Sequence, residues 1–466
     1  NVAIGRSALA TDVLGSKSVA VGNFALQNQK NVDGSNNPVA ADMHNVAVGY
    51  SAGNDITTGI NNTFVGSLSG DAMTIGNQSV AVGYQALSGC VSGDRSVAIG
   101  FQALVAQNNG TTTYDADNVA IGHGAAVSLT TGLRNVAIGS QALDAADDDG
   151  RNVAIGYGSL SAMNTGSSTP YNIAIGYNAG TAVSTGTQNT ILGSLAADAL
   201  NIGAENVVVG YGALTDSQES IGNVIIGHEA GGNLADGDSN VAVGKLALYG
   251  GSSANASNNV AIGAQALRLT TTGGNNVGVG HTAGKATTTG HSNVAIGYES
   301  LLTEDTGRKN VAVGFEALKV QNSDVDNFNT AVGYQAGLAI TEGVQNTLIG
   351  ASAGDHLAHA DFNVAVGYGA LDADIQGSKS TAIGKSSLTN QNYSSATDSH
   401  NTAVGFHSGL SITTGIRNTY VGSLAGDGTT DADFNVAVGF DALSSNVLGS
   451  KSVAVGTDCL TAQKPV

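Results

Sequence analysis

The chain has 466 residues, with 66 Gly but only 3 Pro, and 41% of its residues are hydrophobic. So few prolines exclude a collagen-like chain or a Pro-rich linker, and the hydrophobic fraction is too high for a disordered chain. Seventeen Lys and Arg against 36 Asp and Glu give a net charge of −19, which disfavours nucleic acid and anionic lipid as partners.

No stretch of the sequence approaches the ~20 consecutive apolar residues of a membrane span, so we expect no membrane insertion of this segment. The two cysteines, Cys90 and Cys459, are far apart in the sequence, which indicates unpaired thiols. The chain begins with Asn-Val-Ala-Ile-Gly and stops in mid-pattern at Val466. We therefore interpret it as truncated or processed at both ends.

One pentapeptide recurs 26 times along the chain, and its closing Gly stands at positions 5, 22, 49, 66, 83, 100, 122, 139, 156, 176, 193, 210, 227, 244, 263, 280, 297, 314, 333, 350, 367, 384, 405, 422, 439 and 456. Nineteen of the 25 intervals are 17 residues long, and the other six are longer. The sequence therefore predicts a unit of 17 columns, which insertions only lengthen.

The columns of the unit differ in chemistry. Column 1 is Asn or Ser, columns 2 and 4 are β-branched or aliphatic, column 3 is mostly Ala, and column 5 is always Gly. Column 6 is Tyr or Phe in 12 copies. This alternation predicts a short strand with columns 2 and 4 on one face, and we expect that face to form an aliphatic core.

A unit this short cannot close a core of its own, so the copies are expected to stack. Stacking superposes identical columns, which predicts a ladder of Asn side chains and a stripe of aromatic rings. We therefore predict an all-β chain, a parallel β-solenoid of about 26 turns. It forms one continuous domain over residues 1–466, and the insertions bulge from one edge of it.

Column 3 holds a larger residue in six copies, namely Phe64, Ile191, Val208, Ile225, Leu348 and Tyr420. Five of these six follow a turn whose column 9 is Gly or Ala. Columns 3 and 9 are therefore expected to share a space.

The run Ser-Val-Ala-Ile-Gly at 96–100 resembles the head repeats of YadA-like trimeric autotransporter adhesins and the related repeats of phage tail fibres. The unit Asn-Thr-Ala-Val-Gly-Tyr-Gln-Ala-Gly at 329–337 is most similar to the fibre versions. The resemblance implies a left-handed β-roll assembled as a homotrimer, at a cell surface or in a virion tail fibre. It also implies adhesion to a glycan or protein receptor on a host surface. An outer face rich in Ala, from columns 3 and 8, would let a second chain approach closely.

Several motifs are candidates for ligand or metal sites. Five Asp-x-Asp pairs, beginning at Asp115, Asp236, Asp324, Asp372 and Asp431, fit turns better than a calcium loop. His123, His228 and His281 stand in column 6 and are interpreted as planar rings in an aromatic position. His356 and His359 have ligand-like spacing but no third His or Cys nearby. We therefore expect no metal and no cofactor.

Tyr114, Tyr249 and Tyr393 lie inside insertions and outside the regular columns. Aromatic side chains on loops are common anchors for sugars and proteins, so these three are the candidate binding residues. The alternative is a Tyr that folds back over its own loop.

The favoured function is a structural and adhesive fibre segment without enzymatic activity, located outside the cell. A tailspike-like glycan hydrolase is the first alternative, although no carboxylate pair is unique in a chain whose columns repeat. An ice-binding solenoid is the second, suggested by Thr-Thr-Gly runs, although Thr does not recur in one column turn after turn.

Overall fold

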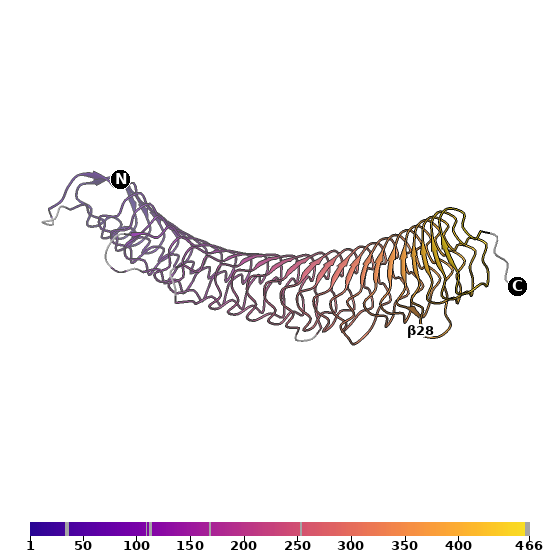
Figure 1. Cartoon of the computed structure of the whole chain (residues 1–466). Coiled ribbons are helices and arrows are strands. Elements are labelled where there is room, and N and C mark those ends of the chain that lie inside the picture. The colour runs from indigo at the N-terminus through magenta and orange to yellow at the C-terminus, as the bar shows by residue number, and fades with distance from the viewer. Residues whose placement is uncertain (33–36, 109, 111–113, 167–168, 252–253, 462–466) are drawn as a thin grey trace. The chain divides into compact units, whose positions relative to one another are not determined.

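The computed structural model describes residues 1–32, 37–108, 110, 114–166, 169–251 and 254–461. Its contacts divide the chain into two compact units, Asn1–Asp236 and Gly237–Val466, which are built in the same way. The described residues form strands and turns and contain no helix (Figure 1). The prediction of an all-β chain is therefore confirmed.

A strand of three residues occupies columns 2 to 4 of every repeat. The first unit contains β1 (Val2–Ile4), β3 (Val19–Val21), β5 (Val46–Val48), β6 (Thr63–Val65), β7 (Val80–Val82), β9 (Val97–Ile99), β11 (Val119–Ile121), β12 (Val136–Ile138), β13 (Val153–Ile155), β14 (Ile173–Ile175), β15 (Thr190–Leu192), β16 (Val207–Val209) and β17 (Val224–Ile226). The second contains β18 (Val241–Val243), β19 (Val260–Ile262), β20 (Val277–Val279), β21 (Val294–Ile296), β22 (Val311–Val313), β23 (Thr330–Val332), β24 (Thr347–Ile349), β25 (Val364–Val366), β27 (Thr381–Ile383), β29 (Thr402–Val404), β30 (Thr419–Val421), β31 (Val436–Val438) and β32 (Val453–Val455).

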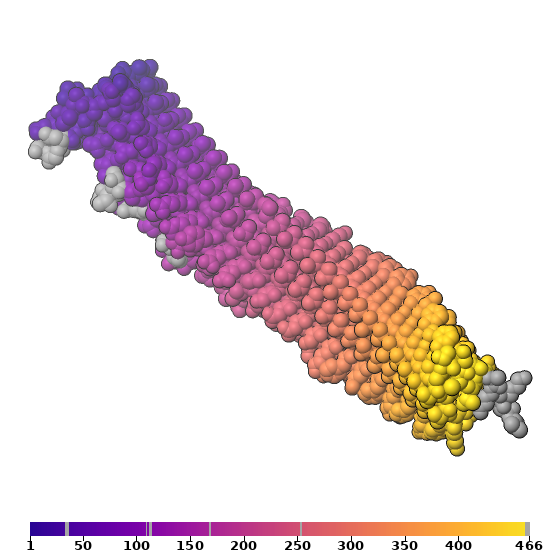
Figure 2. Space-filling view, turned by 45° about the horizontal axis from the view of Figure 1, so that its top comes forward, coloured from indigo at the N-terminus to yellow at the C-terminus, as the bar shows by residue number. Residues whose placement is uncertain are grey.

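Successive strands within each unit pair in parallel and in register. Ala47 of β5, for example, lies beside Phe64 of β6, which comes 17 residues later. Each turn of the chain therefore stacks on the next, and the parallel β-solenoid with a 17-residue turn is confirmed in both units. Figure 2 shows the stacked turns as a space-filling surface. The left-handed sense and the trimer remain predictions.

The strands bury the opposite face to the one that we predicted. Column 3 points into the solenoid, where Ala47 and Ala98 are fully buried. Columns 2 and 4 are half-buried or exposed, and Ile99 of column 4 is 37% exposed. The prediction of a Val/Ile core is therefore wrong, and so is the expected Ala-rich outer face. Alternation separates the two faces of a strand but does not say which is inside. The interior of a 17-residue turn is narrow, and it is lined mainly by small residues.

The core consists of columns 3, 8, 9 and 12. In the turn that begins at Ser79, these columns are Ala81, Ala86, Leu87 and Cys90, and all four are fully buried. Column 9 supplies most of the larger side chains, because Leu is its commonest residue. Each turn thus contributes a thin layer to a core that is continuous within its unit.

The expected exchange of size between columns 3 and 9 is confirmed. A Cβ atom added to Gly53 or Gly70 would lie 2.7 or 2.4 Å from ring carbons of Phe64. A Cβ added to Gly426 would lie 2.7 Å from the ring of Tyr420. The large ring in column 3 thus occupies the space that a side chain in column 9 would otherwise fill.

The Gly of column 5 is required by the backbone and by the spacing of the turns. Gly49 has a φ of +144°, which side chains rarely adopt. A Cβ on Gly49 would also lie 2.4 Å from the carbonyl oxygen of Gly66 in the next turn. Any side chain in this column would therefore push successive turns apart.

The predicted Asn ladder is present in column 1. The backbone N–H of Asn62 donates to Asn45 Oδ1 at 2.9 Å, and the N–H of Ser79 donates to Asn62 Oδ1 at 2.9 Å. The amide Nδ2 of Asn62 donates to the carbonyl of Gly76, near the end of its own turn, at 2.8 Å. Most Asn side chains of this column, like that of Asn62, therefore close their own turn and bind the next one.

Three pairs of two-residue strands connect lengthened turns to the turns before them. They are β2 (Gly15–Ser16) with β4 (Ala41–Asp42), β8 (Gly93–Asp94) with β10 (Tyr114–Asp115), and β26 (Gly377–Ser378) with β28 (Thr397–Asp398). In Figure 1, β28 lies at the lower edge of the second unit, away from the row of three-residue strands. We call this side, between column 9 and the next column 1, the loop edge.

The ladder predicts a strong effect of Asn62→Asp at neutral pH. The substitution removes the amide that donates to Gly76 and places a charge in a fully buried position. We expect a loss of about 2–3 kcal/mol in the free energy of unfolding, measured with urea. The loss should shrink as the pH is lowered, because a protonated Asp is neutral and can donate.

The matched control is Asn61→Asp, one residue earlier, where the side chain is exposed. That variant should change the free energy of unfolding by less than about 0.5 kcal/mol. Equal effects of the two substitutions would contradict a structural role for the ladder.

Candidate functional site

Six turns are longer than 17 residues, and their extra residues all lie on the loop edge. These turns are residues 18–44, 96–117, 152–171, 240–258, 310–328 and 380–400. In four of them column 12 is Gln, which this column otherwise holds only in the incomplete last copy, as Gln463; the four are Gln29, Gln107, Gln321 and Gln391. All four are buried.

Each of these glutamines connects the turn before it to the turn after it. Gln321 Nε2 donates to Glu304 Oε2 at 2.9 Å, and Gln321 Oε1 accepts from Asn329 Nδ2 at 2.9 Å. Gln29 makes the same two contacts with Asp12 and Asn45, Gln107 with Cys90 and Asn118, and Gln391 with Asp374 and Asn401. The lengthened turns are thus anchored by one repeated set of buried polar contacts, which our sequence analysis missed.

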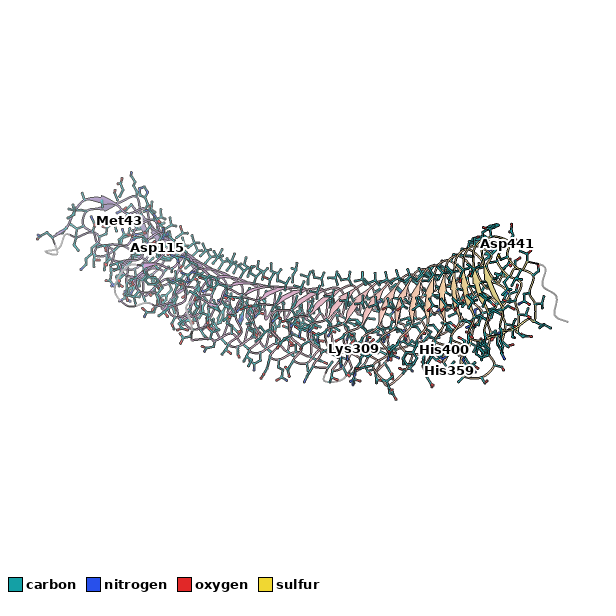
Figure 3. All side chains as sticks on the ribbon, in the orientation of Figure 1. Met43, Asp115, Lys309, His359, His400 and Asp441 are labelled. Carbon is teal, nitrogen blue, oxygen red and sulfur yellow. The ribbon has the colours of Figure 1, made fainter. Side chains whose placement is uncertain are left out.

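An ion pair secures the returning segment of each of these four turns. Lys309 Nζ lies 2.6 Å from Asp326, and Lys379 Nζ lies 2.5 Å from Asp398. Lys17 pairs with Asp42 and Arg95 with Asp115 in the same way. These side chains are 37–56% exposed, so the pairs position the loops and add little to stability. Figure 3 shows Lys309 on the loop edge, together with His359 and His400.

The three candidate tyrosines lie in different surroundings. Tyr393 is only 4% exposed, and its hydroxyl donates to the carbonyl of Gly415 at 2.6 Å while accepting from Asn401 Nδ2 at 3.2 Å. The expectation that Tyr393 is free for a partner is wrong. Its ring packs against Gly377, and its backbone N–H donates to the buried Asp374, so it folds back over its own loop.

Tyr114 and Tyr249 are half-buried. Tyr114 belongs to β10, beside Gly93 of β8. Tyr249 precedes Gly250 in the lengthened turn 240–258. The structure does not bring the three tyrosines together, since each lies in a different lengthened turn, and a binding role for Tyr114 and Tyr249 remains a prediction.

Substitution of Tyr393 tests this placement. Tyr393→Phe removes one buried hydrogen-bonding hydroxyl and should cost about 1 kcal/mol of unfolding free energy. Tyr393→Ala leaves a cavity and should cost about 3–5 kcal/mol. Tyr249→Phe is the control and should change the urea midpoint very little. A neutral Tyr393→Ala variant would contradict the buried position.

Two buried carboxylates belong to the anchors. Glu304 accepts from the N–H of Gly307 at 2.7 Å, and Asp374 accepts from the N–H of Gly377 at 2.9 Å. Burial nevertheless raises the pKa of Glu304 and the pKa of Asp374, because it disfavours the charged form more than the hydrogen bonds favour it. Ionisation of either group therefore destabilises its unit.

The raised pKa of Glu304 predicts a pH-dependent effect of Glu304→Gln. The contribution of this carboxyl group to stability is full below its unfolded pKa and is lost as the pH rises through the folded pKa. The unfolding free energy of the variant minus that of the wild type should therefore increase as the pH is raised from weakly acidic to neutral. Urea unfolding at several pH values measures this difference, and a decrease would show that the ionised form is the favoured one.

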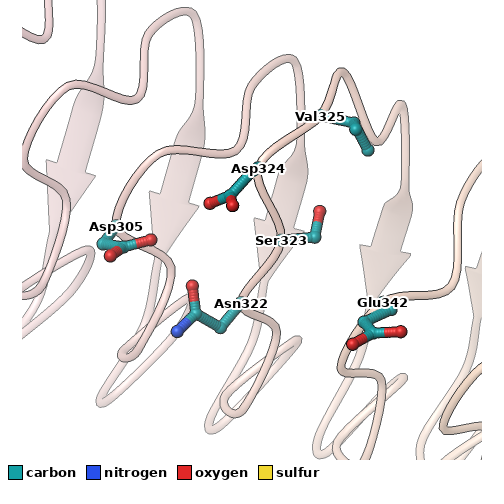
Figure 4. Close-up of a pocket in the computed structure, with 6 residues that line it drawn as sticks. All are labelled: Asp305, Asn322, Ser323, Asp324, Val325 and Glu342. Carbon is teal, nitrogen blue, oxygen red and sulfur yellow. The ribbon is translucent and has the colours of Figure 1, made fainter.

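A pocket of about 470 Å³ opens on the loop edge at the lengthened turn 310–328 (Figure 4). It is lined by Asp305, Asn322, Ser323, Asp324, Val325 and Glu342. Asp324 Oδ1 accepts from Thr306 Oγ1 at 2.7 Å. The lining carries three carboxylates, so the pocket favours cationic or neutral polar groups over anions.

The Asp-x-Asp pairs have partners within the chain. Arg95 lies against both Asp115 and Asp117, and Asp431 Oδ1 accepts from Thr413 and Thr414. Among the described residues, one group brings three potential metal-ligand atoms within 4.8 Å of one another, namely Asp355, His356 and Asp372.

The strand face is a regular surface that runs through all the three-residue strands of each unit. All twelve Tyr and Phe residues of column 6 are 40–62% exposed, beside the exposed Val and Ile of columns 2 and 4. Neighbouring rings stack, and the centroids of Phe315 and Tyr334 are 5.3 Å apart. His123, His228 and His281 each stack on a neighbouring ring, which confirms their interpretation as aromatic substitutes. We call columns 2, 4 and 6 together the apolar strand face.

Among the described residues there is no apolar helix of a length that would span a bilayer. A scan against models of known protein families finds no match, and no curated protein proves similar to this chain. The family resemblance of the pentapeptide therefore remains a resemblance.

Proposed function

We propose that this chain is a segment of an extracellular fibre, a trimeric β-roll that presents a repetitive surface for attachment to a host receptor. The observation that carries the proposal is the apolar strand face, which continues through 13 strands in each unit. Contiguous exposed apolar patches on monomers rarely exceed a few hundred Å², and larger ones generally meet a partner.

Further copies of the same chain are the partner that fits this face. Its rows repeat at the spacing of parallel strands, about 4.8 Å, and a second copy carries rows at the same spacing. Val, Ile, Tyr and Phe of one copy can therefore meet the same columns of another, turn after turn. Three copies around one axis would close such an assembly and cover the face.

Attachment is assigned to the loop edge, which the trimer leaves outside. The lengthened turns place irregular side chains there on anchored loops, and loops on a rigid scaffold commonly carry recognition. Tyr249 is the remaining aromatic candidate of the second unit, because Tyr393 is buried. The receptor class is a host-surface glycan or protein.

The assembly is tested by light scattering on the purified chain. We expect a mass near three times 46.1 kDa. Replacing Ile296, Val332 and Ile383 with Lys places three charges on the apolar strand face and should lower the mass at equal concentration. The control replaces Val325, Ile375 and Val447, exposed apolar residues of the loop edge, with Lys and should leave the mass unchanged. A folded monomeric wild type would overturn the trimer.

Attachment is tested separately on glycan and protein arrays with the labelled chain. The wild type should bind a defined subset of spots, and Tyr249→Ala should weaken that binding by about tenfold or more. Tyr393→Phe, altered at a buried hydroxyl, should bind like the wild type. A wild type that binds nothing on either array would count against adhesion by this segment.

A further inference from the structure

Three polar side chains meet on the loop edge where two regular turns of the second unit stack. Asp355 and His356 come from the turn 346–362, and Asp372 comes from the next turn, 363–379. His356 Nδ1 lies 2.9 Å from Asp355 Oδ1 and 3.7 Å from Asp372 Oδ1. Two ligands bound to one metal at 2.0–2.2 Å lie roughly 3–4 Å apart, so these separations suit a shared ion.

The group is short of positive charge. The side chains of Asp355 and Asp372 are only 15% and 33% exposed, and His356 is the one partner of both in the ion pairs of the described residues. Asp372 Oδ1 is buried and makes no hydrogen bond within the described part of the chain. The ligand atoms of the three side chains lie within 4.8 Å of one another, so the two carboxylates attract a cation between them.

We propose that Asp355, His356 and Asp372 form a binding site for a divalent transition-metal ion of the Zn²⁺ class. One imidazole nitrogen and two carboxylate oxygens are typical ligands of such ions, whereas Ca²⁺ and Mg²⁺ prefer oxygen alone. The side chain of His356 is 64% exposed, so the ion can enter from solvent and keep a water as its fourth ligand. The bound ion joins two successive turns through side chains.

The same turn provides a matched comparison. His359 Nδ1 lies 3.5 Å from Glu342 Oε2, and both side chains are more than half exposed. This pair offers only two ligands, because His359 and Glu342 belong to no group of three potential metal ligands among the described residues. His359 is therefore expected to contribute nothing to tight binding.

The experiment is a calorimetric titration of Zn²⁺ into the full chain, purified without a His tag and stripped of metal. We expect one site per chain. His356→Ala and Asp355→Asn should each lower the affinity by about tenfold or more, while His359→Ala should leave it unchanged. Because His356 is exposed, its removal should not unfold the chain, and circular dichroism checks this.

A second readout is independent of the heat signal. Co²⁺ bound in place of Zn²⁺ should give visible absorption bands in the wild type and in His359→Ala but not in His356→Ala. Zn²⁺ should also raise the melting temperature of the wild type and of His359→Ala, but not that of His356→Ala. The proposal is overturned if millimolar Zn²⁺ does not bind, if His356→Ala binds like the wild type, or if His359→Ala loses binding equally.

Discussion

The spacing between successive turns is the constraint on which the rest of this structure depends. Parallel pairing of the three-residue strands brings neighbouring turns together, and at column 5 the backbones approach so closely that only Gly fits, as at Gly49. Because every turn lies at the same spacing, each column must suit the identical column above and below it. The repetition of the sequence is therefore a consequence of the stacking.

Polar side chains inside the solenoid show how the chain tolerates irregularity. In a regular turn the column 1 Asn closes the turn by donating to a carbonyl near its end, as Asn62 does to Gly76. In four lengthened turns the chain leaves this path, and a buried Gln such as Gln321 contacts the turn before and the Asn after. Buried polar groups need hydrogen-bond partners, and the Gln side chain supplies these partners where the regular path of the backbone is interrupted. Loops of different length can then emerge from one edge without disturbing the core.

The sequence predicted what depends on spacing, and it failed where the choice depends on volume. The 17-residue turn, the parallel strands, the Asn ladder and the exchange between Phe64 and Gly53 all follow from columns that can be aligned. The inner face of the strand could not be read in this way. Val and Ile favour burial in general, but the interior of so small a turn admits Ala47 and leaves Val48 38% exposed.

The loop edge was harder to predict, because its contacts join residues from different turns that no single repeat contains. Tyr393 was expected outside because it lies in an insertion, yet the buried Asp374 beneath it holds the loop against the core. Gln at column 12 was the available signal, since it occurs in four of the six lengthened turns and otherwise only in the incomplete last copy, as Gln463. The group of Asp355, His356 and Asp372 becomes visible only when two turns are placed side by side.

In each unit a strand pairs only with the strands of the turns before and after it, and this bears on how the chain changes over generations. Residues 45–107 and 401–463 align without a gap and share short runs such as Ile-Thr-Thr-Gly-Ile, so the coding sequence contains repeated stretches of similar sequence. Recombination between such stretches would delete or duplicate whole groups of turns. At the new junction two turns that were not neighbours before would stack, and their column 1 residues would make the same contacts as in the other turns. The length of the molecule can therefore vary between descendants much more freely than the sequence of any one turn.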